Sequence, residues 1–148
     1  MQVRKIIGIV FSAIALITLG IFITRTEFSF QLQAWLSFKY YMQFAPYFIS
    51  IMLFYGGVYL IRENPKLNFA LAVFGYTMLE ITVLDWLGIV PNSLGTYPTL
   101  MFIGSGLAAF WISHANSFKS KKLSLKEILI SVFAGALESL LLYYAQFN

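Results

Sequence analysis

The stretch 67–90 (LNFALAVFGYTMLEITVLDWLGIV) constrains this chain most, because it is apolar over most of its length and still contains two acids, Glu80 and Asp85. As an α-helix, these residues would extend ~36 Å, which is enough to cross a hydrocarbon core of ~30 Å. A charged carboxylate at the centre of a bilayer costs at least ~2.5 kcal/mol. The helix must therefore keep its acids neutral or place them against a partner group, away from lipid.

Residues at both ends of this stretch are typical of helix boundaries. Asn64 is a good N-cap, and Pro65 suits the first helical position because its missing N–H has no partner there. At the other end, Gly88 and Pro91 favour a stop. The sequence therefore predicts a membrane-spanning helix over 67–90.

Four further apolar runs predict an all-α bundle that crosses the membrane five times and packs around this acidic helix. Only 11% of the residues are charged and 59% are hydrophobic, whereas soluble domains contain about 25% charged residues. The whole chain, residues 1–148, is therefore expected to form one integral membrane domain. The first run is longer than a signal-peptide core and lacks a cleavage site, so we interpret it as an uncleaved span. The predicted spans are about 6–23, 46–61, 67–90, 98–114 and 125–147.

The distribution of basic residues predicts the orientation of the bundle. With the N-terminus in the cytoplasm, eight of the ten bases lie on the inner side, and only Arg25 and Lys39 lie outside. This arrangement follows the positive-inside rule, and five spans then place the C-terminus outside. The bases occur in short loops, so their expected contacts are lipid headgroups and not nucleic acid. We expect a multi-pass protein of the cytoplasmic membrane of a bacterium or archaeon.

The connection between the first two predicted spans alternates apolar and polar residues over 28–44. This is the periodicity of a strand, but a lone strand would have no pairing partner in a helical bundle. We interpret the segment as an amphipathic interfacial one, with Trp35, Tyr40 and Tyr41 at the depth of the headgroups. An aromatic loop lying on the bilayer is the alternative.

Three of the six acids, Glu80, Asp85 and Glu138, fall in the interior of predicted spans, whereas all ten bases lie in loops or at helix ends. Glu80 and Glu138 are each about thirteen residues from the cytoplasmic end of their helix, a rise of ~20 Å. If the third and fifth spans are neighbours, the two carboxyls can meet, and burial with like charge would leave at least one protonated at neutral pH. Tyr76 and Thr77 lie one turn from Glu80 on its helix and are predicted to hydrogen-bond its carboxyl. These four residues form the predicted proton- or cation-binding site.

The third intramembrane acid, Asp85, is predicted to have a structural role. It lies ~140° around the helix from Glu80 and close to the outer end of the span. We expect Lys39 to reach down to Asp85 and form an ion pair, with Arg25 as the alternative base. Small residues predict where helices pack closely, and the candidates are Gly56, Gly57, Gly104, Ala108 and Gly135. In addition, Ser124 and Glu127 match a capping box at the start of the last span.

The remaining chemistry is sparse. The chain has no cysteine and one histidine, His114, so we expect no disulfide, metal site or cofactor. The motifs of hydrolases, zinc proteases and nucleotide-binding proteins are absent. An enzyme acting on lipid is the least supported alternative, because no nucleophile and base are paired.

Two functional classes remain open. The first is a small transporter or channel subunit, oligomeric, in which Glu80 and Glu138 carry a proton or coordinate a cation. The second is a non-catalytic accessory or assembly subunit, whose acids dock a helix of a membrane-protein partner. A polar cavity around both glutamates would favour the first class. Glutamates that face outward would favour the second.

Overall fold

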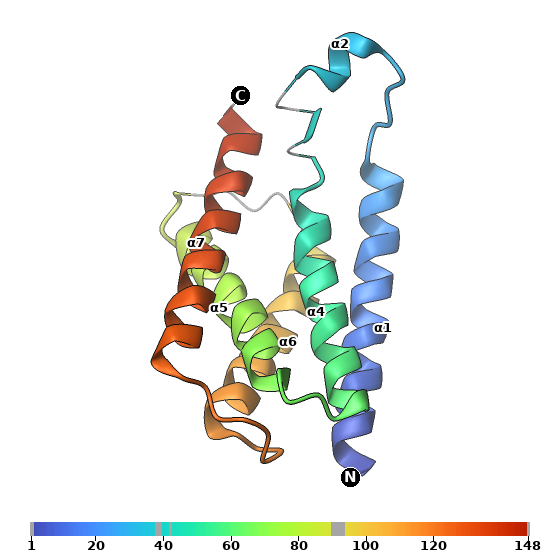
Figure 1. Cartoon of the computed structure of the whole chain (residues 1–148). Coiled ribbons are helices and arrows are strands. Elements are labelled where there is room, and N and C mark those ends of the chain that lie inside the picture. The colour runs from blue at the N-terminus through green and yellow to red at the C-terminus, as the bar shows by residue number, and fades with distance from the viewer. Residues whose placement is uncertain (1, 38–39, 42, 90–93, 148) are drawn as a thin grey trace.

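The computed structural model describes residues 2–37, 40–41, 43–89 and 94–147. Within these ranges every regular element is a helix, so the predicted all-α class is confirmed. The helices are α1 (Gln2–Arg25), α2 (Leu32–Trp35), α4 (Ala45–Arg62), α5 (Leu67–Trp86), α6 (Thr96–Ala115) and α7 (Leu125–Phe147). The long helices run alternately up and down, so the N- and C-termini lie at opposite ends of the bundle (Figure 1).

Three helices of the described chain, α1, α4 and α5, are long and apolar enough to cross a membrane. Their lengths of 24, 18 and 20 residues match a bilayer core, because a helix rises ~1.5 Å per residue against a core of ~30 Å. The outer face of α1 exposes large apolar side chains, among them Ile9, Leu16 and Ile17. Such an apolar outer face is what lipid contact requires.

Small residues let α1 and α4 pack with their backbones close together. A Cβ at Gly8 would lie 2.7 Å from the Gly57 carbonyl oxygen, and a Cβ at Gly57 would collide with Ser12 Oγ. Further along the same pair, Thr18 and Ser50 share a hydrogen bond of 2.9 Å between their hydroxyl oxygens. The α1–α4 pair is therefore held by close contact and by a buried polar bridge.

The acid-bearing helix α5 packs against α4, α6 and α7, whereas α1 packs mainly against α4. A Cβ at Gly75 would lie 3.0 Å from the backbone nitrogen of Phe110 on α6. A Cβ at Gly106 of α6 would lie 2.7 Å from Met78 Cβ on α5. Two glycines, one on each helix, thus bring α5 and α6 together.

Helix α5 is shorter than the predicted span. It ends at Trp86 and not at Val90, because Gly88 adopts a φ of 70° and turns the chain. The N–H groups of Gly88 and Ile89 donate to carbonyls of the last helical turn, each over 2.9 Å. Pro91, which was expected to mark the stop, lies outside the described residues.

The caps predicted for the starts of α5 and α7 can be compared with the structure. Asn64 does not cap α5 directly: its Oδ1 accepts the N–H of Lys66 over 2.8 Å, and the helix begins one residue later. The capping box before α7 is confirmed, because Ser124 Oγ accepts the N–H of Glu127 over 3.2 Å. In return, Glu127 Oε2 accepts the N–H of Ser124 over 2.8 Å.

The connection between α1 and α4 is extended up to Gln31 and then forms the single turn α2. Trp35 Nε1 donates to the carbonyl of Ser29 over 2.7 Å, which folds the segment on itself. It extends past the ends of α1 and α4 (Figure 1) and exposes Phe30 and Leu36. Contact of this segment with a membrane surface stays a prediction.

Candidate functional site: the groove between α5 and α7

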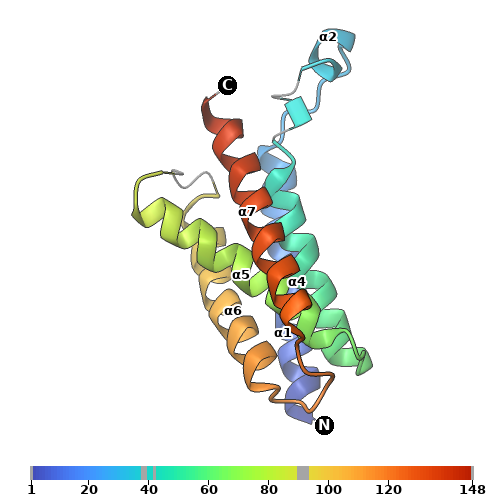
Figure 2. The same ribbon diagram turned by 60° about the vertical axis from the view of Figure 1, so that its left-hand side comes forward.

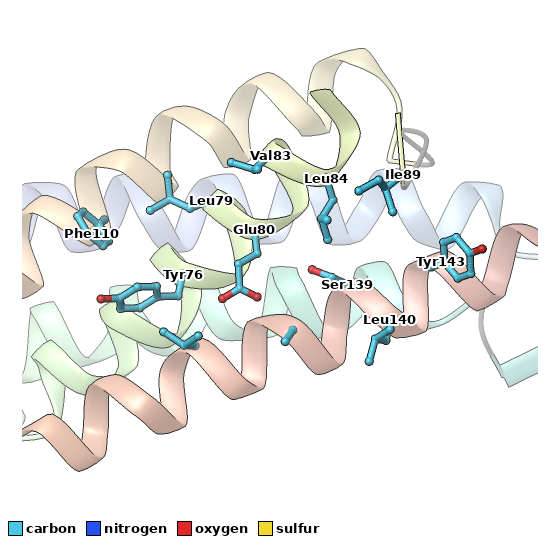
Figure 3. Close-up of a pocket in the computed structure, with 12 residues that line it drawn as sticks. Tyr76, Leu79, Glu80, Val83, Leu84, Ile89, Phe110, Ser139, Leu140 and Tyr143 are labelled. Atoms are coloured by element: carbon cyan, nitrogen blue, oxygen red, sulfur yellow. The ribbon is translucent and has the colours of Figure 1, made fainter. Parts of the chain in front are cut away.

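Glu80 points from the middle of α5 toward α7 (Figure 3). Its carboxyl lies directly over Gly135, where an added Cβ would be 2.9 Å from Glu80 Oε2 and 3.0 Å from its Cδ. The absence of a side chain at Gly135 therefore makes room for the carboxyl. This contact makes the third and fifth long helices, α5 and α7, neighbours in the bundle.

Glu138 follows Gly135 by three residues, so it lies ~4.5 Å further along the axis of α7. Its side chain is only 4% exposed, and its Oε1 has no hydrogen-bond partner in the described part of the chain. Leaving a buried carboxyl oxygen unpaired costs free energy, and the cost is largest for a charged group. The structure thus holds a second acid one turn from the first, facing the interior of the bundle.

A groove of about 820 Å³ opens beside Glu80, between α5 and α7. Figure 2 shows α5 inclined to α7, so that the two helices diverge toward the C-terminal end of α5. The exposure of Val83, Ile89 and Leu140 means that the groove opens at the side of the bundle. Its lining is mainly hydrocarbon and includes Tyr76, Leu79, Glu80, Val83, Leu84, Ile89, Phe110, Val132, Ala136, Ser139, Leu140 and Tyr143.

The predicted partners of the Glu80 carboxyl, Tyr76 and Thr77, have hydroxyls bonded elsewhere. Tyr76 Oη is 3.2 Å from His114 Nε2, and Thr77 Oγ1 donates to the carbonyl of Val73 over 2.8 Å. Tyr76 still lines the groove, whereas Thr77 is buried against α7 beside Gly135. Of the four predicted residues, Glu80 and Tyr76 therefore open onto the groove, and Glu138 and Thr77 do not line it.

Two polar residues of this region were not predicted as part of the site. Ser139 lines the groove, and its buried Oγ has no partner among the described residues. His114 stacks on Phe110, with 4.2 Å between ring centroids, and contacts Tyr76. The i, i+4 spacing of Phe110 and His114 is visible in the sequence, but their position against Tyr76 depends on how α5 and α6 pack.

Asp85 was predicted to pair with Lys39, but Lys39 lies outside the described residues. The alternative partner of Asp85, Arg25, is described, and it forms no salt bridge with Asp85. Instead, Arg25 Nη1 donates to the carbonyl of Leu94 over 2.8 Å, and its guanidinium lies against Gly95. Arg25 thus ties the end of α1 to the connection before α6.

Some of the predicted packing residues contact a neighbouring helix, and one lies on a helix face that contacts no helix of the described chain. Gly57 meets α1, and a Cβ at Gly56 would lie 2.8 Å from Leu71 Cδ2 on α5. Ala108 is half-buried against the core, but Gly104 is exposed, with open space where its Cβ would stand. The glycine of α6 that meets α5 is Gly106, which lies ~200° around the helix from Gly104.

Among the described residues, no group of three or more His, Cys, Asp or Glu side chains is positioned to hold a metal ion. Comparisons with protein-family models, with curated proteins and with solved structures find no match for this chain. Over the residues that the structure describes, the protein is all-helical, and three of its helices have the length and composition to cross a membrane. Its function must therefore be inferred from the groove and its acids.

Proposed function

We propose that this chain is a non-catalytic subunit of a membrane-protein complex, and that the groove between α5 and α7 receives a transmembrane helix of its partner. The observation that supports this is the setting of Glu80. Its carboxyl faces an apolar groove open at the side of the bundle, and no base of the described chain pairs with it. The partner helix would supply a Lys, an Arg or a hydrogen-bond donor at the depth of Glu80.

The proposal includes a bundle in which all five long helices cross the membrane, with the N-terminus in the cytoplasm. Two features support it. Helix α6 contains no Asp, Glu, Lys or Arg, and the part of α7 after Glu127 contains one charged residue, Glu138. The end of the bundle that holds the N-terminus (Figure 1) carries Arg4, Lys5, Arg62, Lys66, Lys119, Lys121, Lys122 and Lys126.

The lining of the groove favours a helix over water as its occupant. A path for protons or cations needs polar groups or water along its length, whereas most residues here are aliphatic or aromatic. A partner helix would cover the apolar wall and also bring its own donor to Glu80. Ser139, with its unpartnered hydroxyl, offers a second polar contact on the same wall.

One observation favours the alternative, proton or cation movement. Glu138 is a buried acid with an unpaired oxygen, one helical turn beyond the level of Glu80. Two acids this close in depth are the arrangement expected of a relay. The two functions are separable, because a relay works in the purified chain and docking needs a second protein.

Photo-crosslinking tests the docking proposal. A photoreactive amino acid at Val83, on the rim of the groove, should give one adduct with a single transmembrane segment. The same group at Ile9, exposed on α1, should not give that adduct. Glu80→Gln should weaken recovery of the partner at least tenfold, while Glu27→Gln, in the exposed connection after α1, should not.

The identity of the captured segment completes the test. A basic or hydrogen-bond-donor residue of the partner helix should lie opposite Glu80. Glu80→Lys should abolish binding of the partner, and a partner in which that residue is changed to Glu should bind the Glu80→Lys chain. Adducts of equal yield at Val83 and Ile9 would contradict the proposal. So would a pH-dependent flux through liposomes containing only this chain, if both Glu80→Gln and Glu138→Gln abolish it.

A further inference from the structure

A second cavity, of about 310 Å³, lies at the end of the bundle that holds the N-terminus. It is lined by Arg4 of α1, by Glu63 after α4, and by Ser117, Phe118 and Lys119 of the loop after α6. Three segments that are far apart in the sequence therefore meet around one polar space. None of these residues belongs to the groove between α5 and α7.

Arg4 lines this cavity and is held there by an ion pair. Its side chain is 13% exposed, and its Nη2 forms a salt bridge with Glu63 Oε1. The Nε of the same guanidinium is buried and has no hydrogen-bond partner in the described part of the chain. Because a guanidinium has five N–H donors in a planar fork, one carboxylate contact leaves further N–H groups of Arg4 for another acceptor.

The loop after α6, which lines the cavity together with Arg4 and Glu63, is held in place by hydrogen bonds. Asn68 Nδ2 donates to Asn116 Oδ1 over 2.7 Å and to the carbonyl of Lys121 over 2.9 Å. Between these two anchors, Lys119 has a φ of 51° and donates its N–H to the carbonyl of Asn116 over 2.9 Å. The loop that carries Lys119 is thus fixed over the start of α5, which lowers the ordering cost of binding.

The charges around the cavity attract an anion. Arg4 and Lys119 line it together with one acid, Glu63. The other acid at this end, Glu127, is already paired with Lys121 over 3.1 Å. Six further bases surround the region, so its potential is positive; they are Lys5, Arg62, Lys66, Lys121, Lys122 and Lys126.

We propose that this cavity binds a phosphate group, with the Arg4 guanidinium and Lys119 Nζ donating to its oxygens. Arginine suits phosphate because its donors match the geometry of the oxygens, and lysine adds a point charge. In the orientation proposed above, the cavity lies at the surface of the inner leaflet. The phosphate can then come from the headgroup of an anionic lipid or from free inorganic phosphate.

Thermal unfolding of the detergent-purified chain tests the site and its source. Short-chain phosphatidylglycerol should raise Tm saturably, and Lys119→Gln should weaken the apparent affinity at least tenfold. Lys126→Gln is the matched control, because it removes a base of the same end that does not line the cavity. Arg4→Lys keeps the charge and removes the planar fork of donors, so it should also weaken binding.

The ligand series separates the two sources. A rise in Tm with phosphatidylglycerol but not with inorganic phosphate identifies a lipid headgroup, and a rise with inorganic phosphate alone identifies a free anion. Equal losses of apparent affinity in Lys119→Gln and Lys126→Gln would overturn the proposal, because binding would then depend on the net charge of this end and not on the cavity. Absence of any saturable rise in Tm would overturn it as well.

Discussion

At the scale of single residues, the contact between Gly135 and Glu80 determines what the groove can hold. The carboxyl fits because α7 has no side chain at this point, and the Cα of Thr77 is equally close, 3.0 Å from an added Cβ. Gly104 shows the opposite case, since the space around it is open. The same residue type therefore has different roles on the two helices.

These two glycines give a matched pair of variants. Gly135→Ala should lower the free energy of unfolding by about 1–3 kcal/mol, because its Cβ must displace Glu80 and Thr77. Gly104→Ala should be neutral or stabilising by up to about 1 kcal/mol, since alanine is the better helix former and meets nothing. Denaturant unfolding in detergent measures both. Equal effects of the two variants would contradict the described contact.

At the scale of elements, the fold depends on close contacts between helix pairs. The α1–α4 pair meets at Gly8 and Gly57, and the α5–α6 pair meets at Gly75 and Gly106. In lipid, helices gain little from hydrophobic burial, so this close packing supplies much of their attraction. The groove occurs where such contact ends, as α5 inclines away from α7 (Figure 2).

The α1–α4 contact predicts a second pair of outcomes. Gly57→Ala should destabilise the bundle by roughly 2–3 kcal/mol, because the added methyl group meets Ser12 and the backbone of Gly8. Gly20→Ala on α1 should leave stability unchanged or raised, since no atom lies within 4 Å of its Cβ position. A shift in Tm for Gly57→Ala that is no larger than that for Gly20→Ala would show that the helices do not approach there.

At the scale of the whole molecule, the ends of the bundle differ in charge, and this predicts its orientation. The chain contains no cysteine, so single cysteines can be introduced without background. Lys122→Cys, at the basic end, should react with a membrane-impermeant maleimide only after the cells are opened. Gln33→Cys, in the connection between α1 and α4, should react in intact cells. The reverse pattern would mean that the N-terminus lies outside.

Much of the architecture follows from the sequence, because long apolar runs leave few alternatives to helices. The residue ranges predicted for four of the spans agree with the bounds of helices α1, α4, α6 and α7 to within a few residues, and the capping box at Ser124 marks the start of α7 correctly. Of the described helices, α1, α4 and α5 are the ones long and apolar enough to cross a membrane. The end of α5 was placed too late, because the left-handed turn at Gly88 stops the helix before Pro91. Local sequence patterns thus predict where a helix lies well, and they predict the residue at which it ends less well.

The site was harder to predict than the fold, because its geometry depends on how helix faces pair. The periodicity of the last helix indicates that Glu138 points into the bundle, and it does. Periodicity does not indicate that Tyr76 turns to His114 on α6, since that contact depends on the α5–α6 packing. It also does not distinguish Gly106 from Gly104, because a small residue on either face gives the same sequence pattern.

In the membrane-spanning arrangement proposed above, the early stop of α5 at Gly88 has a consequence for the surrounding bilayer. Its twenty residues give a helix of ~30 Å, and an inclined helix of that length covers less than the ~30 Å of the hydrocarbon core. Lipid beside the groove should therefore thin locally to relieve the hydrophobic mismatch. A partner with a short apolar span would fit this thinned zone better than one with a long span, so the length of α5 becomes a criterion for choosing that partner.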